Sequence, residues 1–107
     1  MKWSARWRTG RPGTLRSASS ADLDHLSAFV RSREGVEAYL EPRTTVTDTT
    51  VVLVAATGEW TRRRVDGVAG AQAFAKKQQI PLYEVERVGY PSRMRRWTQE
   101  RKERGDP

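Results

Sequence analysis

The feature that most constrains this chain is an uninterrupted apolar run in its middle. Val51–Ala56 contains six apolar residues, enough for one strand but too few for a helix of average length. An apolar run without polar alternation is typical of a strand covered on both faces, so we expect it in the middle of a sheet. Thr57-Gly58 follows and predicts a tight turn, because glycine accepts positive φ.

A second strand is expected beyond this turn, at Glu59–Val65. Its side chains alternate between two faces, with Trp60, Arg62 and Arg64 on one and Glu59, Thr61, Arg63 and Val65 on the other. The two segments therefore predict a hairpin with one buried strand and one solvent-exposed, basic strand.

A helix is expected to begin at about Ser20 and to end near Gly35, since serine is a good N-cap and glycine a frequent stop. One apolar stripe has helical spacing: Leu23, Leu26 and Val30. Val36–Glu41 then alternates polar and apolar residues, with Tyr39 on the polar side. That pattern predicts a half-exposed strand.

The second half of the chain predicts a helix, a strand and a further helix. Asp66 is expected to cap a helix at Val68–Gln79, whose small-residue face suits packing on a sheet. Leu82–Val88 is expected as a fourth strand, and Arg93–Arg104 as a basic helix. One stripe of this last helix is suited to docking: Met94, Trp97 and Arg101.

The expected fold class is α+β, with a single small mixed sheet in the order helix–strand–strand–strand–helix–strand and helices packed on it. A chain of 107 residues suits one domain with one modest core. We divide it into a flexible basic N-terminal tail at 1–20, an α+β domain at 21–90 and a basic C-terminal helix at 91–107.

The composition also bears on location. Cysteine is absent, which excludes disulfides and thiolate metal sites and fits a reducing compartment. No window approaches 18 consecutive apolar residues, so no membrane span is expected. The N-terminus is basic but has no apolar segment behind it, unlike a secretory signal. We therefore expect a cytoplasmic protein.

The net charge of +7 is unevenly distributed. Residues 1–20 contribute +5 and residues 87–107 contribute +4, whereas residues 21–86 contribute −2. Sixteen of the twenty basic residues are Arg, which can bind phosphate through two parallel hydrogen bonds. A GC-rich genome would produce the same Arg bias. The positive excess belongs to the two ends of the chain.

Two tryptophans interleave with the basic residues of the N-terminal tail, as a site that stacks on bases and contacts phosphates requires. The same tryptophans could instead cover an apolar patch of the core or anchor the tail on a membrane surface. The candidate nucleic-acid-binding residues are Arg6, Arg8, Arg11, Arg62, Arg63, Arg64, Arg93, Arg95, Arg96, Trp3 and Trp7.

These features predict a small, basic, non-enzymatic binding protein that associates with RNA or a ribonucleoprotein by neutralising phosphates. RNA and DNA both stay open as partners, as does the oligomeric state. The alternative is a protein–protein interaction module, with Trp60 and Tyr39 on the sheet as its contact patch.

No catalytic signature accompanies the fold. His25 is the only histidine and lies off the apolar stripe, so we expect it on the helix surface, where it cannot complete a Ser–His–carboxylate set. Glu84 and Glu86 share one strand face and are expected to be solvated. No phosphate-cradling glycine loop is present. We expect no catalytic residue, no cofactor and no metal site.

The element order over residues 22–88 resembles the core of the restriction-endonuclease-like nucleases. In that family an Asp opens the second strand and an Asp/Glu-x-Lys triplet follows on the third, and together they hold a divalent metal that activates water. Asp48 stands where the first carboxylate would be, but Arg62-Arg63-Arg64 occupies the region of the triplet. The resemblance therefore implies the fold without the chemistry, and a degenerate nuclease-like domain is a third alternative.

The first five elements also resemble the double-stranded-RNA-binding module. That family places a basic cluster at the start of its second helix, where this chain has Val68-Ala69-Gly70-Ala71. We do not adopt this match, because Lys76 and Lys77 lie near the end of the expected helix instead.

Overall fold

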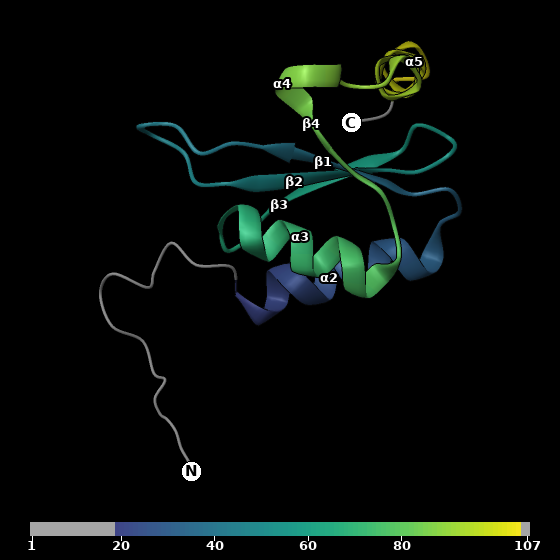
Figure 1. Ribbon diagram of the computed structural model, residues 1–107. Coiled ribbons are helices and arrows are strands. Elements are labelled where there is room, and N and C mark those ends of the chain that lie inside the picture. Colours follow the sequence, from purple (N-terminus) through teal and green to yellow (C-terminus); the bar gives the residue numbers. More distant parts are fainter. Residues whose placement is uncertain (1–18, 106–107) are drawn as a thin grey trace.

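The computed structural model describes residues 19–105, which form one four-stranded sheet with helices on both faces (Figure 1). The elements in chain order are α2 (Ser20–Ser32), β1 (Glu37–Glu41), β2 (Thr50–Val54), β3 (Trp60–Arg64), α3 (Gly67–Gln78), β4 (Leu82–Glu84), α4 (Val85–Val88) and α5 (Ser92–Glu103). This arrangement confirms the predicted α+β class with a single mixed sheet.

The strand order is β3-β2-β1-β4. β1 and β3 each pair antiparallel with β2, whereas β4 pairs parallel with β1 after the crossover through α3. The apolar run lies mid-sheet as predicted, because β2 has a paired strand on each side, and Val51–Val54 are fully buried.

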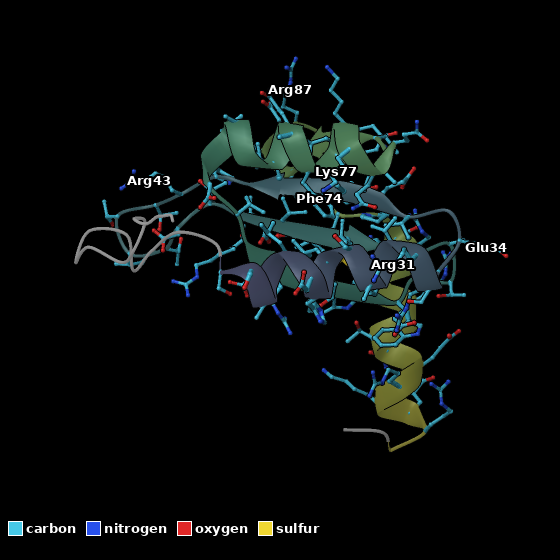
Figure 2. All side chains as sticks on the ribbon, turned by 90° about the horizontal axis from the view of Figure 1, so that it is seen from below. Arg31, Glu34, Arg43, Phe74, Lys77 and Arg87 are labelled. Carbon is cyan, nitrogen blue, oxygen red and sulfur yellow. The ribbon has the colours of Figure 1, made fainter. Side chains whose placement is uncertain are left out.

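Two separate apolar layers cover the sheet. α2 and α3 lie on one face, and α4 and α5 lie on the other (Figure 1). On the first face the core includes Leu26, Phe29, Leu40, Val51, Leu53 and Phe74. On the second face a smaller cluster contains Tyr39, Val52, Val54 and Met94, with Trp60 and Tyr90 packed against it. Figure 2 views the first face, with α2 and α3 in front of the sheet.

The start of α2 follows from local chemistry. Ser19 is the N-cap, its hydroxyl accepts a hydrogen bond of 3.0 Å from the Asp22 amide, and the Asp22 carboxylate accepts one from the Ser19 amide. This reciprocal pair is a capping box, which confirms the predicted boundary. The predicted stripe is only partly correct, because Leu23 stays 38% exposed.

Asp66 occupies the N-cap position of α3 as expected, but its side chain makes no capping hydrogen bond. The predicted position of the cap is therefore confirmed, but the Asp66 side chain does not form it. The backbone ψ of 71° places this residue outside the extended region from which an N-cap side chain usually reaches the first turn.

Two predictions about strands were wrong. β4 ends at Glu84, and Val85–Val88 form the single helical turn α4, which closes with a hydrogen bond from the Gly89 amide to the Val85 carbonyl. β4 pairs with β1 over only three residues, and the chain turns into α4 although β1 continues to Glu41. Tyr39 was expected on an exposed face but is only 5% exposed, because the second layer of helices covers it.

The turn between β2 and β3 approaches α5 closely. Gly58 has a φ of +97°, and a Cβ atom built there would lie 2.2 Å from the Arg93 carbonyl oxygen and 2.9 Å from the Trp97 Cβ. The turn therefore requires glycine for two reasons. Its φ is positive, and a Cβ atom at this position would clash with α5.

We expect Gly58→Ala to destabilise the protein more than Gly67→Ala. Gly67 also has a positive φ, +69°, but open space surrounds its missing Cβ. Gly67→Ala should therefore cost only the backbone strain of about 1–2 kcal/mol, whereas Gly58→Ala must in addition displace α5. Urea unfolding measures both variants. Equal losses of unfolding free energy in the two variants would show that the close approach of the turn to α5 does not contribute to stability.

Candidate functional site

Arg93 anchors the start of α5 to the sheet. Its Nε donates to the Ala55 carbonyl at 2.9 Å, and its Nη2 donates to Glu37 Oε1 at 2.8 Å. The Tyr39 hydroxyl donates to the same carboxylate oxygen at 2.9 Å. The hydrogen bond from Arg93 holds the pKa of Glu37 below its usual value, and burial together with this carboxylate raises the pKa of Tyr39 to about 12.

A second polar cluster surrounds Glu41 at the other end of β1. Arg62 donates to both carboxylate oxygens, at 2.8 and 2.9 Å, and the Thr50 hydroxyl donates at 2.6 Å. The Tyr90 hydroxyl, just before α5, also donates to Glu41. Burial by itself raises the pKa of Glu41, but these hydrogen bonds outweigh it and lower the pKa below the usual value.

The three predicted strand arginines each lie beside a carboxylate. Arg62 pairs with Glu41, and its guanidinium carbon lies 5.4 Å from the ring centre of Trp60. Arg63 lies 3.8 Å from Asp22 of α2, and Arg64 lies 3.6 Å from Asp48. The alternation predicted for β3 is confirmed, so these arginines do not share one face. Their charge is largely balanced within the domain.

The exposed side of α5 has two different flanks. Arg95, Gln99 and Lys102 are spaced i, i+4 and i+7 and form the first flank. Neither Arg95 nor Lys102 makes an ion pair with another described residue. The second flank has the same spacing but carries two acids: Arg96, Glu100 and Glu103. The first flank, which we call the cationic flank, bears two positive charges and no acid.

The inward side of α5 packs on the sheet through few contacts. Met94 is buried, and Trp60 Nε1 donates to the Thr98 hydroxyl at 3.0 Å. The Arg101 guanidinium lies 4.6 Å from the ring centre of Trp97, which confirms the predicted stripe. Figure 2 shows the far end of α5 projecting beyond the edge of the sheet, so the helix is only partly covered.

A pocket opens beside the cationic flank. It has a volume of about 340 Å³ and is lined by Tyr90, Met94, Arg95, Thr98 and Gln99. A different groove of about 280 Å³ lies between α2 and α3, with Leu23 and Phe74 in its wall. The pocket is the more informative feature, because Arg95 lines it and no acid does, whereas the groove is lined by Asp66 as well as Lys77.

The predicted site residues have three outcomes. Trp3, Trp7, Arg6, Arg8 and Arg11 lie outside the described residues. Arg62, Arg63, Arg64 and Arg93 contact carboxylates, and Arg93 is in addition an anchor of the fold. Arg95 and Arg96 are exposed but lie on opposite flanks. The sequence reasoning missed Gln99 and Lys102, which the i, i+4, i+7 spacing from Arg95 could have shown.

The predicted protein-contact patch is not on the surface. Tyr39 is buried and Trp60 is half-buried between Arg62 and α5. His25 also differs from the expectation, because it is half-buried and its Nε2 lies 2.6 Å from the Thr61 hydroxyl. Burial, assisted by Arg63 and Arg33, lowers the pKa of His25 and favours its neutral form.

Residues 19–105 contain no group of three or more His, Asp or Glu side chains that could hold a metal ion. Asp48, the residue at the nuclease-like position, lies beside Arg64 instead. None of the helices in this part of the chain is long and apolar enough to cross a membrane.

The fold and the site define a small α+β protein whose mixed sheet carries a partly exposed cationic helix. Searches of protein-family models, curated proteins and solved structures found no match to the chain. The resemblance to the restriction-endonuclease-like core therefore stays a prediction.

We expect Glu41→Gln to reduce the stability of the protein at pH 7 by about 1–3 kcal/mol, because it removes a charged acceptor from four hydrogen bonds. The pKa of Glu41 is lower in the folded protein than its ordinary 4.5. Its contribution is therefore complete above pH 4.5 and is lost as the pH falls through the folded pKa.

The difference in unfolding free energy between wild type and Glu41→Gln should accordingly shrink between pH 7 and pH 3. Urea titrations at several pH values measure it. Glu86→Gln removes one exposed carboxylate from α4 and serves as the control. A difference that stays constant with pH would contradict the role given to Glu41.

Proposed function

We propose that this protein binds nucleic acid and that the cationic flank of α5 contacts the phosphate backbone. The observation that carries the proposal is the contrast between this flank and the arginines of β3. Arg95 and Lys102 have no described carboxylate partner, whereas the arginines of β3 each have one. Cations without internal partners are the groups that can exchange counterions for phosphates.

The geometry of α5 supports this function. Arg95 and Lys102 are seven residues apart, or about two helical turns and 10.5 Å along the axis. Phosphates along one strand of DNA are about 3.4 Å apart in rise, so the two cations can contact different phosphates. Because Arg93, Trp60 and Gly58 fix the helix on the sheet, its flank is held in place before binding.

The sequence at the N-terminus adds to the proposal. Residues 1–18 carry five basic residues and no acid. The same segment also contains Trp3 and Trp7. If this segment joins the flank on the same strand, it supplies further phosphate contacts and aromatic groups for stacking. The partner we propose is RNA or DNA, bound mainly through its backbone.

We expect the double variant Arg95→Gln/Lys102→Gln to bind nucleic acid more weakly. The slope of the logarithm of the binding constant against the logarithm of salt concentration should fall by roughly 1.5, the loss of two phosphate contacts. Fluorescence anisotropy with a labelled oligonucleotide between 20 and about 200 mM salt measures the slope. The control is Arg87→Gln/Arg96→Gln, which removes the same charge from α4 and from the acidic flank. Equal slopes for the two double variants would contradict the assignment to the cationic flank.

A chain that begins at Ser19 should also show a smaller salt slope, because it lacks five of the basic residues. The capping box of α2 is retained in this shortened chain, so circular dichroism should report the same helix content in residues 19–105. If the chain of 107 residues binds neither RNA nor DNA even at low ionic strength, the proposed function is wrong.

A further inference from the structure

The pocket beside the cationic flank has the dimensions of a small-ligand site. Its volume of about 340 Å³ lies at the lower end of the range for ligand pockets, roughly 300–1,000 Å³. It is lined by side chains from α5 and by Tyr90 from the loop before it. A pocket of this size suits a small group rather than an extended cofactor.

The walls of the pocket are fixed by the rest of the fold. The Tyr90 hydroxyl is engaged by Glu41, so the residue offers mainly its ring to a ligand. Met94 is buried against the sheet, and the Thr98 hydroxyl already accepts a hydrogen bond from Trp60. These three side chains therefore have little conformational freedom left to lose on binding. The Tyr90 ring beside Met94 favours an aromatic or flat apolar ligand.

The rim of the pocket is polar in a specific way. Arg95 lines it and makes no ion pair with a described residue. Gln99 lines it as well, and its amide makes one long hydrogen bond of 3.3 Å, to Glu103. An amide offers both a donor and an acceptor, the combination presented by the edge of a nucleobase. A guanidinium beside it is placed to bind the attached phosphate.

We propose that this pocket binds one unpaired base of a single-stranded nucleic acid, with Tyr90 and Met94 against the base, Gln99 at its edge and Arg95 on a neighbouring phosphate. The inference rests on the proposed function and narrows it. Bases inside a duplex are stacked and paired and cannot enter a pocket, whereas single-stranded nucleic acids present theirs to aromatic side chains. The pocket therefore selects single strands over duplexes.

The test compares strands that differ only in their bases. The chain of 107 residues is titrated with a labelled single strand of twelve nucleotides, with a base-free strand of the same length and charge, and with the corresponding duplex. Each is tested as RNA and as DNA. Because the proposed contact is with the base, we expect the same preference for the base-bearing strand in both. The base-bearing strand should bind at least about five-fold more tightly than the base-free strand, the ratio that corresponds to one stacked base.

Two variants assign this preference to the pocket. Gln99→Ala should reduce the ratio between base-bearing and base-free strands toward one, because it removes the amide at the edge of the base. Arg95→Gln should weaken the binding of both strands and keep their ratio, because both carry the phosphate. Arg96→Gln, which removes the same charge from the opposite flank, should also keep this ratio. Both pocket positions lie on the exposed side of α5, so the variants should unfold at the same urea concentration as the wild type.

The outcomes separate this inference from the proposed function. If base-bearing and base-free strands bind equally, the pocket does not take a base and the inference is overturned, while backbone binding stands. A ratio that survives in Gln99→Ala overturns it too, because the base is then bound elsewhere. If no strand binds at low salt, both proposals fail.

Discussion

The structure depends on one apolar strand, β2, whose side chains must be buried on both faces of the sheet. Along β2 the side chains alternate, so Val51 and Leu53 join the core under α2 and α3, whereas Val52 and Val54 face α5. A single layer of helices would leave half of this strand in water. The basic C-terminal helix is thus part of the fold: it closes the second layer over the most apolar segment of the chain.

This second layer is attached more by polar contacts than by apolar ones. Met94 is the buried residue of α5, so the helix also relies on the hydrogen bonds of Arg93 and Thr98 and on the close approach at Gly58. Each of these contacts joins positions at least 35 residues apart in the chain, the separation between Gly58 and Arg93. A helix held in this way keeps most of its length in solvent, which leaves its outer flank available for a partner.

Local patterns predicted the parts of the fold that local forces decide. The capping serine of α2, the turn at Gly58 and the alternation along β3 follow from the spacing and backbone preferences of neighbouring residues. The burial of Tyr39 could not be predicted in this way, because it depends on where α5 docks. The early end of β4 is also not visible locally, because the strand-like composition continues to Val88, whereas the chain turns into α4 after Glu84.

The same distinction governs the candidate site. The sequence shows how many arginines the chain has, but it does not show which of them are balanced by carboxylates brought close by folding. Arg62 meets Glu41 across the sheet and Arg63 meets Asp22 from another layer, and no local pattern reveals either pair. The cationic flank is different, because it lies on one helix and its spacing is visible in the sequence. Its pocket combines both kinds of information, since Arg95 comes from local spacing, while Tyr90 is held in place by Glu41 from a distant strand.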